Sequence, residues 1–210
     1  MGILLSIKPE YVEKILNGDK TIEIRKSMPR CELPIKVYLY CTKGQELWGD
    51  GTGNTWYGIA EDEDMERIFE LTPTLARLNC KVVAEFTLNK VDCLKSVRYK
   101  LYGTHYQYNE VSDEILTKSC FTQEQVLNYT NGNDLYAWHI DNLIIYDKPK
   151  ELSDFKKENK CHYANYEEGC CFEHCTFFDL KDCDGKYSKI TVAPQNYMFV
   201  EDIKEIGEEI

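Results

Sequence analysis

Three ionisable side chains lie close together near the N-terminus of the chain: Lys20, Glu23 and Arg25. Lysine and arginine can bind phosphate or a base edge, and a carboxylate can pair with arginine or accept a hydrogen bond from an amine. Glu23 and Arg25 are two residues apart, which places them on the same face of a strand. The spacing therefore predicts a small charged site, with a solvated strand face as the alternative interpretation.

The residues around this charged group predict a strand, a short helix and a second strand. The apolar run Ile3 to Leu5 fits a buried strand. Pro9 suits the first position of a helix, and Asn17-Gly18 suits a helix C-terminus. Alternating isoleucines then indicate a strand whose other face carries the charged group. The three ionisable side chains thus lie at the predicted junction between a helix and a strand.

Residues 18–25, GDKTIEIR, resemble the G-x-K-x-x-E-x-R signature of the ASCH domain (activating signal cointegrator homology), a family with a PUA-like fold. The preceding SIKPEYVEKILNG is similar to the lead-in of phage and bacterial members. Two later blocks, HIDNLIIYDKPKELSDF at residues 139–155 and APQNYMFVE at residues 193–201, also resemble them. The resemblance covers most of the chain in separated blocks. It implies an α+β fold, namely a PUA-like mixed β-barrel with short helices.

Further patterns predict the elements that complete this fold. Strands are predicted over residues 34–42, 79–94, 135–146 and 195–200, and helices are predicted to open at Ser112 and Thr122. Residues 48–56 indicate a loop, residues 61–70 a helix, and residues 99–108 either a loop or a strand. Strands and short helices without βαβ regularity are typical of an α+β domain. We expect one domain over residues 1–210, with insertions at about 43–78 and 156–190.

The charge of the chain is strongly acidic overall but not at its start. The 210 residues carry a formal net charge of −11, whereas residues 1–43 hold eight Lys and Arg against five Asp and Glu. Phosphate contacts need clustered cations, so the overall charge disfavours binding to a long duplex. A locally basic cleft on an acidic protein fits a small or single-stranded anionic ligand better. The sequence lacks a membrane-span pattern and a signal-peptide pattern, which predicts a cytoplasmic protein without a membrane partner.

A cysteine-rich segment at residues 161–183 holds five of the ten cysteines and two of the four histidines. Thiolate and imidazole ligands at this density can enclose a tetrahedral Zn²⁺, the one cofactor that the sequence suggests. The candidate ligands are Cys161, Cys171, Cys175 and Cys183, with His174 or Cys170 able to substitute. No C-x2-C pair is present, so reduced and partly buried thiols are the alternative interpretation.

The ASCH resemblance implies a binding module that holds RNA or a nucleotide in a cleft beside the G-x-K-x-x-E-x-R motif. Lys20 and Arg25 would contact phosphate or a base edge, and Glu23 would pair with Arg25 or accept from an exocyclic amine. Trp138 or Tyr136 would stack on a base. Trp138 and His139 complete the predicted ligand-binding residues.

An enzyme is the second hypothesis. The resemblance also extends to ASCH proteins that are amidohydrolases and remove the acetyl group from N4-acetylcytidine with a Lys, a Thr and a distant Glu. Lys20 matches that lysine, whereas Glu23 stands where those enzymes carry threonine, so catalysis would fall to Lys20 and Glu23. Other ASCH proteins resemble ribonucleases, in which His105 or His139 could act as general base. A third hypothesis is a protein-interaction module built on the acidic surface and the cysteine-rich segment.

Overall fold

The computed structural model describes residues 1–43, 47–49, 55–57, 66–67, 78, 80–102, 104–130, 132–158 and 187–202. Most of the two predicted insertions, all of the predicted zinc ligands and residues 203–210 lie outside the described residues. The division into one domain with two insertions therefore stays a prediction.

Strands and short helices follow one another irregularly along the described residues. The strands are β1 (Gly2–Ile7), β2 (Ile22–Arg25), β3 (Ile35–Cys41), β4 (Leu47–Gly49), β5 (Thr55–Tyr57), β6 (Glu66–Arg67), β7 (Val82–Leu88), β8 (Val91–Leu94), β9 (Ser96–Leu101), β10 (Thr104–Asn109), β11 (Leu135–His139), β12 (Asp141–Lys150), β13 (Lys156–Glu158), β14 (Tyr187–Lys189) and β15 (Tyr197–Val200). The helices are α1 (Pro9–Leu16), α3 (Asp113–Ser119) and α4 (Gln123–Thr130), with a 3-10 turn η1 (Leu152–Asp154). This mixture confirms the predicted α+β class.

The largest sheet has the strand order β12-β7-β3-β1-β15. Its β1 runs parallel to β3 and antiparallel to β15, and the other pairs in the sheet are antiparallel. One face packs against α1 through Val12 and Ile15, and the other face packs against Phe155 and Ile190. Since both faces are covered, all six residues of β1 are buried.

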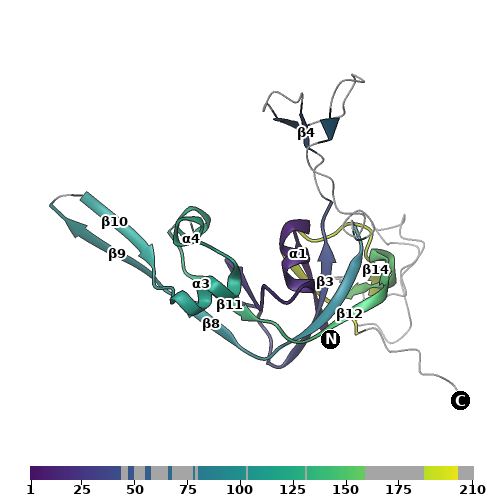
Figure 1. Ribbon diagram of the computed structural model, residues 1–210. Helices are drawn as coiled ribbons and strands as arrows, with labels where there is room; N and C mark the ends of the chain where they lie inside the picture. Colours follow the sequence, from purple (N-terminus) through teal and green to yellow (C-terminus); the bar gives the residue numbers. More distant parts are fainter. Residues whose placement is uncertain are drawn as a thin grey trace, which may run out of the picture.

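A second, antiparallel sheet has the order β2-β11-β8. The chain passes from one sheet to the other where β7 leads into β8 and where β11 leads into β12 (Figure 1). Both sheets are open, because β12 and β15 are edges of the first and β2 and β8 are edges of the second. The described strands therefore do not close into the mixed β-barrel that the family resemblance implies.

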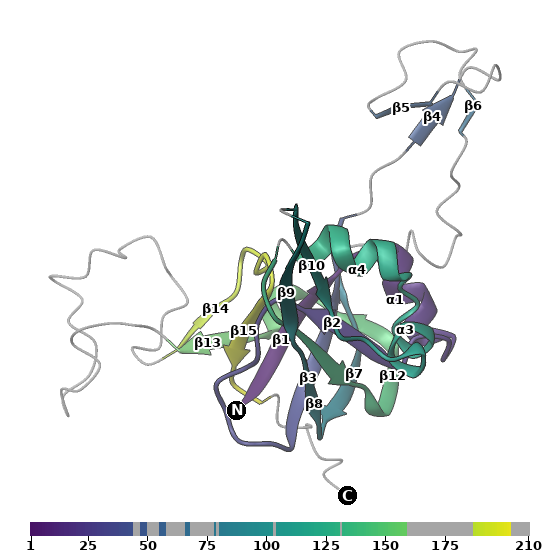
Figure 2. The ribbon, with the colours of Figure 1, turned by 90° about the vertical axis from the view of Figure 1, so that its left-hand side faces the viewer.

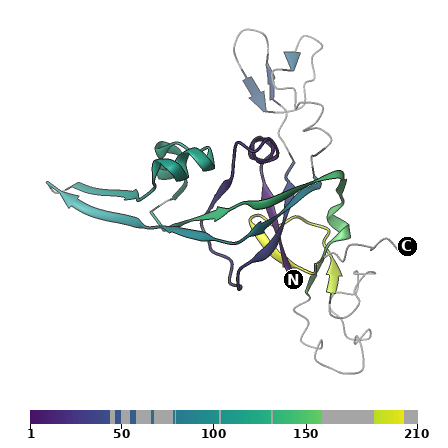
Figure 3. The same ribbon diagram turned by 60° about the horizontal axis from the view of Figure 1, so that its bottom comes forward.

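The helices α1, α3 and α4 gather on one side of the molecule (Figure 2). Val126 of α4 packs on Ile22, Ile24 and Ala137 of the second sheet and forms a separate apolar cluster with them. The strands β9 and β10 pair with each other and run away from both sheets as a two-stranded arm (Figure 3). We call residues 96–109 the arm.

Several predicted elements differ from the structure. The predicted strands at residues 79–94 and 135–146 are each two strands, because the chain changes sheet at residues 89–90 and at Ile140. The predicted loop at residues 48–56 contains parts of the paired strands β4 and β5. The residues of the predicted 61–70 helix that the structure describes, 66–67, form the short strand β6. Residues 99–108, left open between loop and strand, belong to the arm.

Candidate functional site

The helix-to-strand junction before β2 is built by the end of α1. Pro9 occupies the first turn of α1, and the helix ends at Asn17, after which Gly18 adopts a φ of +82°. The Lys20 N–H donates to the Lys14 carbonyl at 3.0 Å, and the Thr21 N–H donates to the Lys118 carbonyl at 2.9 Å. The second of these bonds holds the end of α3 against the junction. Lys20 is therefore enclosed on that side by residues that are distant from it in the sequence.

Lys20 is enclosed by partners that come from distant parts of the chain. Its side chain is 0% exposed, and its ammonium donates to the Ser119 carbonyl at 2.6 Å. The same ammonium lies 3.2 Å from Glu23 Oε2 and 5.3 Å from the centre of the Tyr11 ring. Burial lowers the pKa of Lys20 below its ordinary 10.5, although the Glu23 carboxylate acts in the opposite direction.

Glu23 and Arg25 extend this network into the space between the two sheets. Glu23 Oε1 forms an ion pair with Arg25 Nε at 3.0 Å, so both carboxylate oxygens of Glu23 face a cation. The Arg25 guanidinium also donates to Asn196 Oδ1 at 3.1 Å and to the Ser6 carbonyl at 2.5 Å. Two buried cations thus share one buried carboxylate, which leaves a formal charge of +1 in the network.

An aromatic row borders this network. The rings of Tyr11 and Phe121 stack with centroids 5.6 Å apart, and Phe121 meets Tyr129 edge-on at 6.2 Å. The Lys20 ammonium lies 5.2 Å from the Phe121 centroid. Burial raises the pKa of the Tyr129 hydroxyl, while the nearby Arg25 opposes the shift. The row therefore covers the ammonium with rings and limits its access to water.

The structure confirms one part of the predicted site geometry and corrects two others. The ion pair between Glu23 and Arg25 is present, as their common strand face predicted. Lys20, which the resemblance predicts to contact phosphate or a base edge, is fully enclosed. The alternative of a solvated strand face is wrong, because all four residues of β2 are buried.

Trp138 and His139 differ sharply in what they can contact. Trp138 is fully buried, donates through Nε1 to the Ser27 carbonyl at 3.2 Å and packs on Tyr197 with ring centroids 5.3 Å apart. Its ring cannot stack on a ligand, which corrects that prediction. His139 is partly exposed, and its Nε2 lies 2.7 Å from Asp92 Oδ2. It forms a surface pair apart from the buried network.

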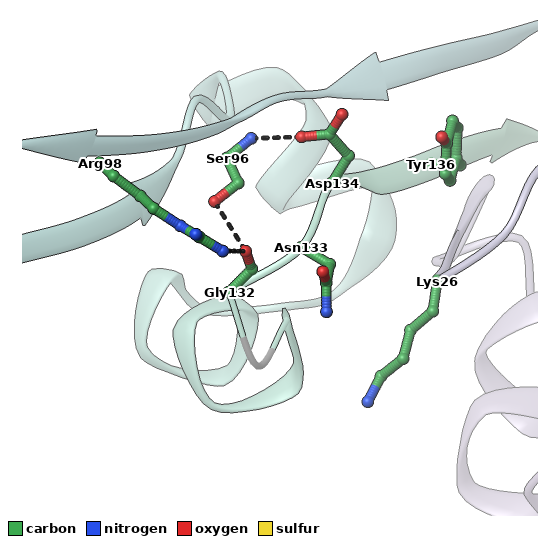
Figure 4. A pocket seen from close by; sticks show the side chains of 7 residues that line it. All are labelled: Lys26, Ser96, Arg98, Gly132, Asn133, Asp134 and Tyr136. Atoms are coloured by element: carbon green, nitrogen blue, oxygen red, sulfur yellow. Dashed lines mark hydrogen bonds between the residues drawn. The ribbon is translucent and has the colours of Figure 1, made fainter.

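An open groove of about 480 Å³ lies between the arm and the end of β2 (Figure 4). We call it the β2 groove. It is lined by Lys26, Ser96, Arg98, Gly132, Asn133, Asp134 and Tyr136. In Figure 4, Lys26 enters from the side opposite Arg98, and Tyr136 pairs in register with Arg25 of the motif. The groove therefore adjoins the strand that carries the predicted site.

One wall of the β2 groove is fixed by hydrogen bonds between the arm and residues 132–134. Arg98 Nη2 donates to the Gly132 carbonyl at 2.9 Å, and Ser96 Oγ donates to the same carbonyl at 3.2 Å. The Ser96 N–H donates to Asp134 Oδ1 at 2.8 Å. These contacts hold the base of the arm against the loop between α4 and β11, while Arg98 itself stays exposed.

Sequence reasoning did not single out Lys26 and Arg98. Lys26 directly follows the motif, and its ammonium lies 4.7 Å from the centre of the Tyr129 ring. Arg98 lies just before the tyrosine-rich stretch that was left open between loop and strand. The excess of basic residues in 1–43 could have pointed to Lys26. Nothing comparable in the sequence indicates that Arg98 lies at the same groove.

Among the described residues, no three or more His, Cys, Asp or Glu side chains form a group that could hold a metal ion. The predicted zinc ligands lie outside those residues, so the zinc site stays a prediction. Within the described part of the chain, no helix is long and apolar enough to cross a membrane.

Comparison with known proteins gives likenesses to solved structures alone. No protein-family model and no curated protein matches the chain. The chain is similar to the crystal structure of ASCH from Zymomonas mobilis, with a TM-score of 0.42, 13% identity and coverage of 72% of this chain and 73% of that one. Two mutants of the same protein match with TM-scores of 0.40 and 0.35, each at 13% identity. The first covers 72% of this chain and 76% of that one, and the second covers 70% of each.

Proposed function

We propose that this protein binds single-stranded RNA or a nucleotide in the β2 groove. The observation that carries the proposal is the meeting of two exposed cations, Lys26 and Arg98, with the partly exposed ring of Tyr136 in one groove of an acidic protein. Cations bind phosphate, and an aromatic face can stack on any base. The groove thus offers both kinds of contact that an unpaired nucleotide needs.

In this proposal the G-x-K-x-x-E-x-R residues position the groove and do not line it. Arg25 donates to Asn196 Oδ1, and Asn196 Nδ2 donates in turn to Ser27 Oγ at 3.0 Å. Lys26 lies between these two anchored residues, so its backbone is held on both sides. The net positive charge of the buried network adds to the attraction for phosphate. The resemblance of residues 18–25 to the ASCH signature agrees with this class of ligand.

The test is a titration of a short labelled single-stranded RNA, followed by fluorescence anisotropy over a range of salt concentrations. We expect Lys26→Ala and Arg98→Ala each to weaken binding several-fold. Each should lower the slope of log affinity against log salt by about 0.7, the value for one lost phosphate contact on a single strand. Lys148→Ala, which removes an exposed cation from β12, is the matched control and should change neither quantity. RNA binding that is absent, or equally strong in all four proteins, would contradict the proposal.

A second candidate function is the hydrolysis of an N4-acylated cytidine, and the lowered pKa of Lys20 is the observation that favours it. The reaction requires the enclosed ammonium to become accessible to the substrate, because the Lys20 side chain is 0% exposed. A lysine must lose its proton to act as a base or nucleophile, and burial lowers the pKa of this ammonium. The direct test is acetate release from N4-acetylcytidine. Lys20→Arg should abolish the release, because arginine keeps its proton at ordinary pH. No release by the unchanged protein would eliminate this candidate.

A further inference from the structure

The arm carries cations and an exposed ring beyond the point where it borders the β2 groove. Arg98 lines the groove, and Lys100 lies two residues farther along the same strand. Alternate residues of a strand point to the same face, so both cations belong to one face of β9. Both are exposed. A line of positive charge therefore leaves the groove and continues outward along the arm.

The tip of the arm continues this line with an aromatic side chain. Tyr102 follows the end of β9, adopts a φ of +47° and is 98% exposed. A large ring that is this exposed gains nothing from packing within the fold, and its face is open for stacking on an unpaired base. Arg98, Lys100 and Tyr102 together present the pair of contacts, cation and ring, that the groove itself presents.

The length of the arm suits a chain better than a single nucleotide. The six residues of β9 span about 20 Å at the rise of a β-strand. Known folds that bind single strands take up about 4–16 nucleotides by combining a basic track with stacking rings. The basic track on the projecting arm is complementary to a polyanion, and, because the protein is acidic overall, also to the acidic surface of a second copy.

We infer that a single-stranded nucleic acid runs from the β2 groove along the Arg98–Lys100 face of the arm to Tyr102. The inference rests on the proposed function and deepens it, because it makes the ligand a strand of several nucleotides. The groove binds one end of the strand. Lys100 binds a phosphate farther along, and Tyr102 stacks on an unpaired base.

The experiment compares uridine monophosphate with an oligouridylate of about ten nucleotides. Each is titrated into the unchanged protein, Lys100→Ala, Tyr102→Ala and the control Lys148→Ala. We expect the oligonucleotide to bind more tightly than the monophosphate. Lys100→Ala should lower its salt slope by about 0.7, and Tyr102→Ala should weaken its binding about tenfold. Neither arm variant should change the affinity for the monophosphate, and Lys148→Ala should change nothing.

The possible failures separate the inference from the proposed function. If the oligonucleotide binds, depends on Lys26, and is indifferent to Lys100 and Tyr102, the arm inference is overturned and the groove proposal stands. If neither ligand binds, both fall. If the unchanged protein self-associates in sedimentation and Tyr102→Ala abolishes the association without affecting the oligonucleotide, the arm joins two copies of the chain and the inference is likewise overturned.

Discussion

At the scale of single residues, the most consequential feature is that one buried carboxylate forms ion pairs with two buried cations. Glu23 faces Lys20 at 3.2 Å and Arg25 at 3.0 Å, and all three side chains are buried. Removing one partner from a buried ion pair leaves an uncompensated charge, which is far more costly than the loss of an exposed pair. The stability of β2 should therefore depend on Glu23.

We expect Glu23→Gln to lower the free energy of unfolding by about 3 kcal/mol, because Lys20 and Arg25 lose their shared counter-ion. Urea denaturation measures this change. Glu114→Gln is the matched control, since Glu114 forms an exposed ion pair with Lys118 at 2.7 Å and should contribute little. Equal effects of the two substitutions would show that the buried network is not what holds the strand.

A second buried carboxylate, Glu85, predicts a pH dependence. Burial alone would raise its pKa, but hydrogen bonds from Lys36 and from the Tyr146 hydroxyl outweigh burial and lower the pKa below the ordinary 4.5. A lowered folded pKa gives stability that is present above pH 4.5 and is lost as the pH falls through the folded value. The difference in unfolding free energy between the unchanged protein and Glu85→Gln should therefore shrink below pH 4.5. Asp147→Asn, which removes an exposed carboxylate from β12, is the matched control.

At the scale of elements, the turn after α1 determines where the motif begins. Gly18 has a φ of +82°, a conformation that side chains with a Cβ rarely adopt, and no atom lies within 4 Å of the place a Cβ would occupy. Gly18→Ala should lower the free energy of unfolding by about 1 kcal/mol through backbone strain alone. Gly18→Asn should cost less, because asparagine tolerates this conformation. A larger loss with asparagine than with alanine in thermal melts would point to crowding in place of strain.

The sequence predicted those elements whose signals are local. The ends of α1 are marked by Pro9 and Gly18, and the start of α4 is marked by Thr122, which exchanges hydrogen bonds with Gln125 in a capping box. The burial of Lys20 could not be predicted in this way. Its enclosing partner Ser119 lies 99 residues away in the chain, and nothing in residues 18–25 indicates that α3 arrives there.

The changes of sheet were equally hidden from the sequence. Residues 135–146 keep the alternation of a single long strand across Ile140, although β11 and β12 belong to different sheets. The candidate site was predicted only in part for the same reason. The G-x-K-x-x-E-x-R residues form one continuous motif, whereas the groove joins Lys26 to Arg98, which only the packing of the arm brings near.

At the scale of the whole molecule, the charge distribution limits the shape of the ligand. The formal net charge of −11 repels a long polyanion, whereas the groove and the arm present the exposed cations Lys26, Arg98 and Lys100. A duplex presents phosphates on two strands and hides its base faces. The acidic protein would therefore repel it, and no tyrosine could stack on its bases. We therefore expect double-stranded RNA of the same length to bind about fivefold or more weakly than the single strand in a competition assay, because one stacked base contributes at least about 1 kcal/mol. Equal competition by the duplex would mean that the groove reads backbone charge alone.

The passage of β11 directly into β12 ties the two sheets into one mechanical unit. Ile140 separates the two strands, and its N–H donates to the Thr21 carbonyl at 2.9 Å, at the entrance to β2. Neither sheet can separate from the other without pulling on the chain that runs from β11 into β12. Amide hydrogen exchange should accordingly find β2, β11 and β12 opening in a single cooperative step, while the arm exchanges on its own, faster timescale.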